Sequence, residues 1–316
     1  MDQPHKSVTE GGAATMAMAD AGRLMKLATK ASVAVALILI AVKMAAVLLT
    51  GSISILSSLI DSLMDVLASA INLFAVHHAL QPPDAEHRFG HGKAEPLAGL
   101  GQAAFIAGSA VLLTIEAVRR LFEPHAVTDI EVGMAVMAFS MALTILLVAF
   151  QRYVVRRTGS TVIAADALHY ESDVLINGSV IISLGLSKWL GWQAADPIFA
   201  ILIAGYLVRG AWSIAAKSLD VLMDREFPDA ERARITEIAM RHPEVTGMHD
   251  LRTRRAGLQQ FIQLHLEMDG DKRLIEAHDI ADEVEAWICE AYPGAEVIIH
   301  QDPHGLEEHH PGYTGA

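Results

Sequence analysis

The sequence predicts a polytopic α-helical membrane protein with six transmembrane helices, followed by a small C-terminal α+β domain. Two observations predict the membrane part. Of the 316 residues, 52% are hydrophobic and only 19% are charged, and the apolar residues gather in runs of about 20 residues, the length that crosses a bilayer. A third observation predicts the second part: beyond residue 217 the long apolar runs stop, and shorter segments with strand or helix periodicity follow.

Six apolar runs supply the predicted transmembrane helices. Glycine, proline or charged residues separate them, and such residues interrupt helices or stay out of the bilayer. Residues 1–22 are small and polar and are expected to form a mobile tail, which leaves residues 23–217 for the membrane domain. The approximate bounds of the six runs are Leu27–Leu49, Ile53–Ala79, Ala94–Leu121, Val132–Val155, Ile163–Leu186 and Pro197–Ala216.

Basic residues indicate the orientation of these helices. Lysine and arginine gather before the first run, between the second and third, between the fourth and fifth, and after the sixth. The other side has fewer, namely Arg119, Arg120 and Lys188. The positive-inside rule therefore predicts that both termini are cytoplasmic.

Residues 218–303 are predicted to form the α+β domain, and residues 304–316 are predicted to form a second mobile tail. The alternation of Ile262, Leu264 and Leu266 with polar residues is typical of a strand with one buried face. The order helix, strand, strand, helix, strand predicts a sheet with helices on one face. The expected elements are Asp229–Arg241, Gly247–Arg255, Gln260–Met268, Leu274–Tyr292 and Ala295–His300.

The charge balance narrows the class of partner. The net charge is −13, and residues 225–316 hold 19 acidic against 9 basic side chains, a difference of −10. An acidic domain argues against nucleic acid as a partner and suits cation handling, although solubility alone also explains it. Cys289 is the only cysteine, so no intrachain disulfide framework is expected.

Two pairs of ionisable residues lie inside the apolar runs. Asp61 and Asp65 are four residues apart, as are His169 and Asp173, so each pair shares one face of its helix. Three carboxylates inside a bilayer cost on the order of 10 kcal/mol by simple addition. One imidazole and three carboxylates make the four ligands of a tetrahedral divalent metal. The pattern predicts a metal transport site, and buried carboxylates bonded to neighbouring Ser or Asn are the alternative.

Two further groups have weaker metal-ligand spacing. Asp84, His87 and His91 follow the second run at intervals of three and four residues, which is compatible with zinc, although a solvated histidine loop explains the spacing equally well. In the α+β domain a two-ion cluster is the hypothesis, and scattered structural histidines are the alternative. Its candidate ligands are His249, His265, His278, His300 and Asp302.

Longer motifs carry a family resemblance. The second run contains GSISILSSLIDSLMD at residues 51–65, the loop after it FGHGKAE at 89–95, and the fifth run ALHYESD at 167–173. The α+β domain contains HDLRTR at 249–254 and VIIHQDP at 297–303. With these motifs in this order, residues 24 to 303 resemble the cation diffusion facilitator family, most closely its bacterial ferrous-iron and zinc efflux branch.

The resemblance implies an assembly and a location. Members are homodimers in the bacterial inner membrane, with cytoplasmic termini and a metallochaperone-like cytoplasmic αββαβ domain that joins the two subunits. It also implies a charge interlock, a salt bridge between Lys93 and Asp224 near the joint of the two domains. The three groups of ligands above become, by resemblance, a transport site, a loop site and a cytoplasmic two-ion site.

The resulting expectation is a divalent metal efflux transporter and not an enzyme. Zn²⁺ is expected to be both cargo and a structural or regulatory ion, with no organic cofactor. The cargo could equally include Fe²⁺, Cd²⁺ or Mn²⁺, because N/O sites discriminate poorly among these ions. Protons compete with metal for the same ligand atoms, which predicts Zn²⁺/H⁺ antiport. Two alternatives stay open: a membrane-anchored metal sensor that does not transport, and a proton-coupled carrier of an organic solute.

Overall fold

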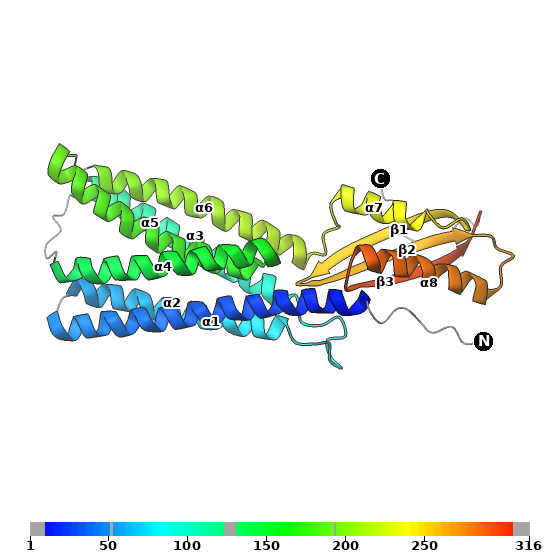
Figure 1. The fold of residues 1–316 in the computed structure, drawn as a ribbon. Coiled ribbons are helices and arrows are strands. Elements are labelled where there is room, and N and C mark those ends of the chain that lie inside the picture. The colour runs from blue at the N-terminus through cyan, green and yellow to red at the C-terminus, as the bar shows by residue number, and fades with distance from the viewer. Residues whose placement is uncertain (1–9, 51–52, 123–130, 193, 306–316) are drawn as a thin grey trace. The chain divides into compact units, whose positions relative to one another are not determined.

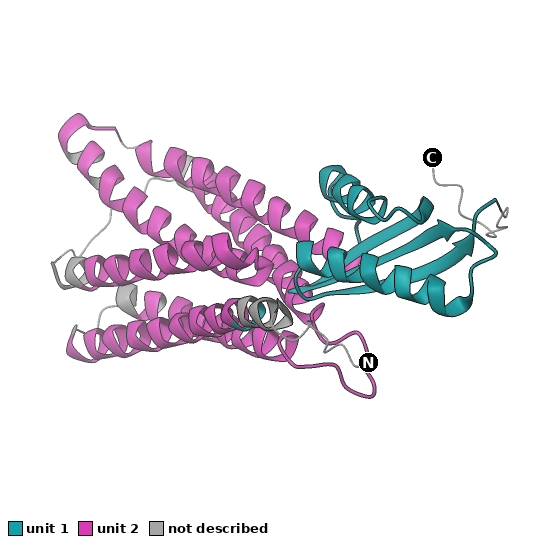
Figure 2. Ribbon diagram, turned by 45° about the vertical axis from the view of Figure 1, so that its right-hand side comes forward, with its two compact units in different colours: residues 1–19, 224–316 teal, residues 20–223 magenta. Residues whose placement is uncertain are grey.

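The computed structural model describes residues 10–50, 53–122, 131–192 and 194–305. The chain divides into two compact units, one of residues 20–223 and one of residues 1–19 with 224–316 (Figure 2). The first unit is a bundle of long helices (Figure 1). These helices are α1 (Glu10–Thr50), whose residues 10–19 belong to the other unit, α2 (Ile53–Ala79), α3 (Ala94–Phe122), α4 (Glu131–Thr158), α5 (Thr161–Leu190) and α6 (Ala195–Leu222).

Among the described helices, α1, α2, α3, α4 and α6 each contain a stretch long and apolar enough to cross a membrane. The remaining long helix, α5, is not in this set, which covers only the described residues, and its first half carries Asp166, Glu171 and Asp173. It nevertheless packs against α3, α4 and α6 inside the bundle. The predicted fold class, an apolar helical bundle followed by a small sheet with helices, is confirmed.

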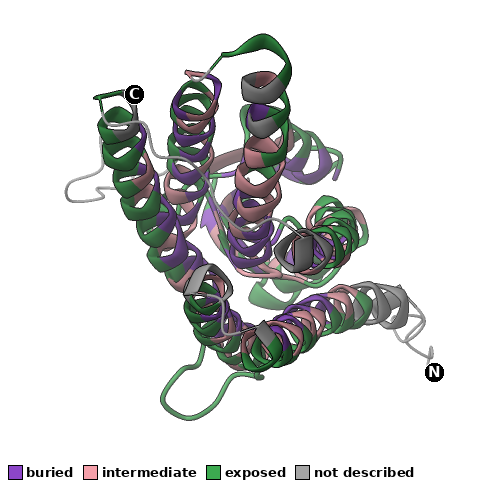
Figure 3. Ribbon diagram, turned by 90° about the vertical axis from the view of Figure 1, so that its left-hand side faces the viewer, coloured by how far each residue is buried: buried purple, intermediate pink, exposed green. Residues whose placement is uncertain are grey.

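Large apolar side chains remain on the outside of the bundle. Leu112, Leu146 and Trp212 are 69%, 69% and 76% exposed. In Figure 3 the buried residues lie on helix sides that face neighbouring helices, and exposed residues cover the outer sides. Water-soluble monomers rarely expose so much apolar surface, and such a surface is suited to contact with lipid.

Small residues allow α5 and α6 to approach closely. A Cβ atom added to Gly210 of α6 would lie 2.5 Å from Leu168 Cδ2 of α5, so any larger residue would force the Leu168 side chain to move. Such contacts are the usual basis of helix association in membranes. Leu168 directly precedes His169, so the crossing also sets the position of a predicted ligand.

The second unit contains α7 (Asp229–Ala239), β1 (Val245–Ala256), β2 (Gln259–Met268), α8 (Leu274–Ala291) and β3 (Ala295–Pro303). The sheet order is β1-β2-β3, with β1 antiparallel and β3 parallel to the central β2. Ile262, Leu264 and Leu266 of β2 are fully buried against the helices. The predicted alternation in this strand is confirmed, and it leaves His265 on the other face.

The observed bounds differ from the predicted ones at the N-terminus. Residues 1–22 were expected to be a tail, but α1 already begins at Glu10. Alanine recurs between Ala13 and Ala21, and alanine is the strongest helix former, so the segment continues the helix without an apolar run. Residues 1–9 of this tail, and residues 306–316 of the predicted C-terminal tail, lie outside the described residues.

Candidate metal centres

Two helices bring three of the predicted transport ligands together. Asp65 lies near the middle of the 27-residue α2, and His169 and Asp173 lie one turn apart on α5. His169 Nε2 is 2.9 Å from Asp65 Oδ1, and the ligand atoms of all three residues lie within 4.8 Å of one another. The side chains of His169 and Asp65 are only 13% and 12% exposed. One imidazole and two carboxylates thus converge inside the bundle.

Asp61, the fourth predicted ligand, is not in this cluster. It is exposed, one turn before Asp65 on α2, and a helical turn separates the two positions by about 5.4 Å along the axis. Asp61 still acts electrostatically on Asp65 and on Asp173. Its carboxylate therefore adds negative charge at the edge of the cluster without joining it in this conformation.

A buried carboxylate next to the cluster fixes the rotation of α5. Asp166 is 2% exposed and accepts hydrogen bonds from Ser32 Oγ of α1 at 2.6 Å, Asn72 Nδ2 of α2 at 3.0 Å and Gln151 Nε2 of α4 at 2.6 Å. A buried carboxylate is stable only with such partners. Because Asp166 precedes His169 by three residues, this network turns the ligand face of α5 toward α2.

Sequence reasoning did not assign this network a role. Tyr170 extends it, since its hydroxyl lies 2.9 Å from Ser69 Oγ of α2. The available signal was the presence of Asp166, Asn72 and Gln151 inside otherwise apolar runs. Polar residues in such runs almost always face the bundle interior.

The loop between α2 and α3 holds the second group. Asp84 Oδ1 is 3.3 Å from His87 Nδ1, and Asp84 Oδ2 is 3.2 Å from His91 Nε2. The ligand atoms of the three residues lie within 4.8 Å of one another. The backbone amide of His87 donates to the Asp84 carboxylate and lowers the pKa of that group. The structure thus gathers all three predicted residues, with Asp84 as an ionised acceptor.

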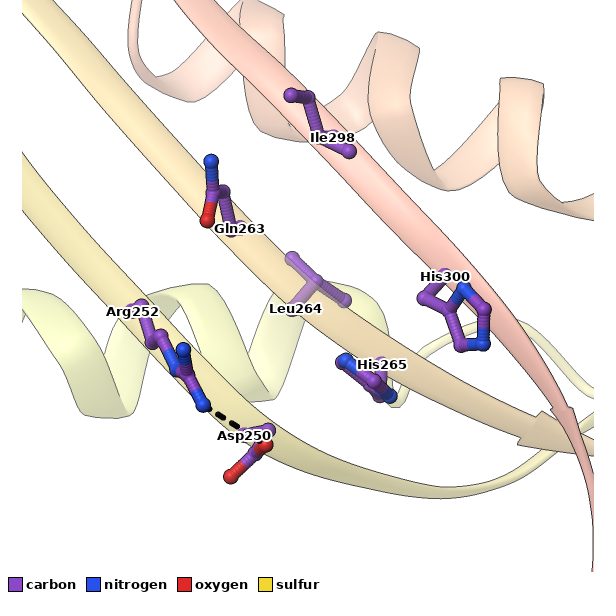
Figure 4. Close-up of a pocket in the computed structure, with 7 residues that line it drawn as sticks. All are labelled: Asp250, Arg252, Gln263, Leu264, His265, Ile298 and His300. Atoms are coloured by element: carbon purple, nitrogen blue, oxygen red, sulfur yellow. Dashed lines mark hydrogen bonds and ion pairs between the residues drawn. The ribbon is translucent and has the colours of Figure 1, made fainter. Parts of the chain in front are cut away.

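The sheet register aligns the histidines of the second unit. His265 on β2 is directly opposite His249 on β1 and His300 on β3, and the neighbouring ring centroids are 5.0 and 4.7 Å apart. The register of β1 shifts between His249 and Arg252, and such bulges re-aim side chains. Figure 4 shows His265 and His300 on adjacent strands, lining one hollow with Arg252.

Asp302 on β3 is the centre of this cluster. It is 5% exposed, and its carboxylate oxygens lie 2.7 Å from His265 Nδ1, 3.1 Å from His300 Nε2 and 3.6 Å from His249 Nε2. The ligand atoms of His249, His265 and Asp302 lie within 4.8 Å of one another. Two imidazoles and a buried carboxylate are a suitable donor set for Zn²⁺.

His278, a predicted ligand in this unit, lies outside the cluster, and Glu267 is a neighbour of the cluster that the sequence analysis did not predict. His278 lies on α8, where its Nδ1 is 3.5 Å from Asp282 Oδ1, and it does not join the cluster. Glu267 was not predicted, yet its carboxylate lies 3.2 Å from His249 Nδ1 and 2.9 Å from His304 Nδ1. The signal for Glu267 was its position two residues after His265, which places both side chains on the same face of β2.

The predicted charge interlock joins residues of separately described units. Lys93 Nζ donates to the backbone oxygen of Leu222 at 3.3 Å, and Asp224 Oδ1 is 3.5 Å from Arg254 Nη1. The pairing of Lys93 with Asp224 therefore stays a prediction.

Comparison with known proteins now decides the family. Residues 29–223 match the model of the cation efflux transmembrane domain, and residues 227–304 match that of the cytoplasmic domain of cation efflux proteins. The cation-efflux pump FieF of Salmonella choleraesuis (strain SC-B67) is 48% identical over 282 residues, which cover 89% of this chain and 94% of FieF. FieF of Salmonella typhimurium (strain LT2) matches with the same identity and coverage.

The chain belongs to the cation diffusion facilitator family. It is a multi-pass membrane protein of a transporter family, and the predicted family resemblance is confirmed. A solved structure of the Zn form of CzrB shares 36% sequence identity. The match covers 27% of this chain and 99% of that one, with a TM-score of 0.25.

This cation diffusion facilitator also has a cation beside the predicted transport ligands, which sequence reasoning missed. The half-buried Lys43 of α1 donates from Nζ to the backbone oxygen of Ser58 at 3.1 Å and to Ser62 Oγ at 2.7 Å, both on α2. It acts electrostatically on Asp61, Asp65 and Asp173. Lys43 thus offsets part of the negative charge of these three carboxylates.

Replacing Lys43 by methionine is expected to lower the KM for Zn²⁺ by about tenfold and to slow its release. At an effective dielectric constant of 20, two unit charges 4 Å apart contribute about 4 kcal/mol, and about half that at twice the distance. Zinc uptake into proteoliposomes at graded zinc concentrations measures this effect. Lys43→Arg keeps the charge and is the control. Equal KM values for the two variants would contradict the electrostatic role.

Proposed function

We propose that this protein exports Zn²⁺ from the cytoplasm in exchange for protons, by alternating access to a site formed by Asp65, His169 and Asp173, with Asp61 at its edge. The observation that carries this proposal is the 2.9 Å contact between His169 Nε2 and Asp65 Oδ1, with Asp173 in the same cluster. A nitrogen and several carboxylate oxygens inside membrane-crossing helices suit a divalent cation as cargo. Fe²⁺, Cd²⁺ and Mn²⁺ are accepted by the same donors.

The same contact supports exchange with protons. An imidazole nitrogen and a carboxylate oxygen at 2.9 Å attract each other only if a proton lies on one of them. Zinc needs both atoms deprotonated, so its arrival from the cytoplasm expels that proton. On the opposite side, protons return to these atoms and release the ion. Alternating exposure of one site near the middle of the membrane is the usual geometry of such carriers.

The cytoplasmic domain is proposed to bind zinc and to join two subunits. His249, His265, His300 and Asp302 offer converging nitrogen and oxygen donors, and His278 is proposed as a ligand of a second ion. When bound, Zn²⁺ supplies positive charge to an acidic domain. The match of residues 227–304 to the family's cytoplasmic domain supports a homodimer. Zinc there shifts the population toward the subunit arrangement that binds it better.

The location and domain limits follow the same proposal. The protein is placed in the bacterial inner membrane with both termini cytoplasmic, as the distribution of basic residues predicts. Residues 23–217 form the transport domain and residues 218–303 the cytoplasmic domain. The loop site of Asp84, His87 and His91 is proposed to face the cytoplasm, and the salt bridge between Lys93 and Asp224 stays a prediction of the family resemblance.

Flux in proteoliposomes tests the proposed function. Purified protein is reconstituted with a zinc dye and a pH dye inside, and a pH gradient is imposed. We expect zinc to enter while protons leave, and we expect a protonophore that dissipates the gradient to slow the zinc flux. Zinc flux that is unaffected by the proton gradient would contradict antiport. If no divalent metal is transported, the alternative of a membrane-anchored metal sensor is favoured.

A further inference from the structure

A third histidine lies against the loop site. His78 belongs to the last turn of α2, and its ring centroid is 4.5 Å from that of His91, at an interplanar angle of 59°. The ring of His91 is in turn 4.6 Å from that of His87. Three imidazoles from a helix end and a loop are therefore in contact beside Asp84.

The contact of His78 with Gln81 leaves the other ring nitrogen as the candidate metal ligand. Its Nδ1 lies 3.1 Å from Gln81 Oε1, and an amide oxygen only accepts hydrogen bonds, so Nδ1 carries the proton. The neutral ring then has its lone pair on Nε2. Metal-binding histidines are commonly oriented in this way, by donating their second nitrogen to an oxygen acceptor.

His91 provides an independent indication of a ligand. Its side chain is only 5% exposed, and within the described part of the chain its buried Nδ1 has no hydrogen-bond partner. Its Nε2 lies 3.2 Å from Asp84 Oδ2. A buried unpaired imidazole nitrogen is unfavourable unless another group satisfies it, and a metal ion does so.

We propose that His78 is the fourth ligand of the loop site, which then holds Zn²⁺ with three imidazole nitrogens and one carboxylate oxygen. The inference rests on the proposed loop site of Asp84, His87 and His91, and it adds a ligand from the end of a membrane helix. Three protein ligands leave one position of a tetrahedral zinc open, whereas four close it, as in structural sites. His78 is not in the group whose ligand atoms already lie within 4.8 Å of one another. Binding it therefore requires the side chains of Asp84 and His87, which are 51% and 55% exposed, to close around the ion.

With four protein ligands, the ion is retained and links the loop to α2. With an open position, the loop site could exchange its ion with water and pass it on. With His78 bound, the ion ties residues 84–91 to the helix that carries Asp65. Zinc at this site then stabilises the cytoplasmic end of α2 and is not a step on the transport path.

A thiolate in place of the His78 imidazole tests directly whether the side chain at this position binds the metal. The full chain is prepared with Asp65→Ala and Asp302→Ala, so that the transport and cytoplasmic clusters are weakened, and His78→Cys is added. Titration with Co²⁺ is expected to produce a near-ultraviolet charge-transfer band, because a thiolate bound to Co²⁺ absorbs there. His77→Cys is the matched control, since His77 is the exposed neighbour on the same turn. Both proteins retain Cys289, so its contribution cancels.

Affinity provides the second readout. In the same background, His78→Ala is expected to weaken Co²⁺ and Zn²⁺ binding by at least about tenfold, and His77→Ala to leave it unchanged. The proposal is overturned if His78→Cys shows no more charge-transfer absorption than His77→Cys, or if the two alanine variants bind alike. These results are independent of the flux assay. If the wild type exchanges zinc for protons but His78→Cys shows no charge-transfer band, only the assignment of the fourth ligand is rejected. If the band is present but the wild type transports no zinc, only the proposed transport function is rejected.

Discussion

Replacing Asp65 by alanine is expected to reduce zinc flux to the level of protein-free liposomes. Asp65 supplies an oxygen to the cluster and is the partner of His169 at 2.9 Å. Its loss leaves one imidazole and one carboxylate, too few ligands to strip water from a divalent ion. It also removes the acceptor for the proton held between the two residues. Zinc binding and proton counterflow should therefore disappear together.

Two comparison variants isolate this effect. Met64→Ala changes a neighbouring side chain of α2 that is 49% exposed, and it should transport like wild type. Asp61→Ala removes a carboxylate outside the cluster, so we expect a raised KM with flux retained. Zinc and pH dyes in the same proteoliposomes measure all three. Full flux in Asp65→Ala, or an equal loss in Met64→Ala, would contradict the assignment of the transport site.

Replacing Asp302 by alanine is expected to remove zinc from the cytoplasmic cluster and to weaken binding there by about a hundredfold. Three histidines contact this one carboxylate, the nearest at 2.7 Å. Even outer partners of metal ligands contribute about 10- to 100-fold in affinity, and Asp302 lies at the centre. Calorimetric titration and the metal content of the purified protein measure the loss. Transport should persist in part, because the membrane cluster is untouched.

His278→Ala is the matched control for this experiment. His278 lies on α8 beside Asp282 and outside the cluster. The ion held by His249, His265 and Asp302 should therefore remain, and only the proposed second ion should be lost. Because Asp302 is buried, Asp302→Asn serves as a second variant that keeps the shape of the side chain, and thermal unfolding shows whether the domain still folds. Unchanged zinc binding in folded Asp302→Ala and Asp302→Asn would refute the cytoplasmic site.

The sequence alone determined those features that depend on order within a single element. Helical periodicity placed His169 and Asp173 on one face of α5, and strand alternation predicted the buried Ile262 and Leu264 of β2. The insertion cost of carboxylates in apolar runs identified Asp65 as a candidate metal ligand. The motifs, in their order along the chain, indicated the family.

Only the tertiary structure decided which elements meet. Asp65 and His169 are 104 residues apart in the chain, and periodicity sets the direction of a side chain without naming the helix it faces. Packing left Asp61 and His278 outside their clusters, and it brought His78 and Lys43 close to ligands of other segments. These arrangements depend on helix crossings, such as that of Gly210 with Leu168, and on strand register. Neither is encoded in the spacing of residues within one segment.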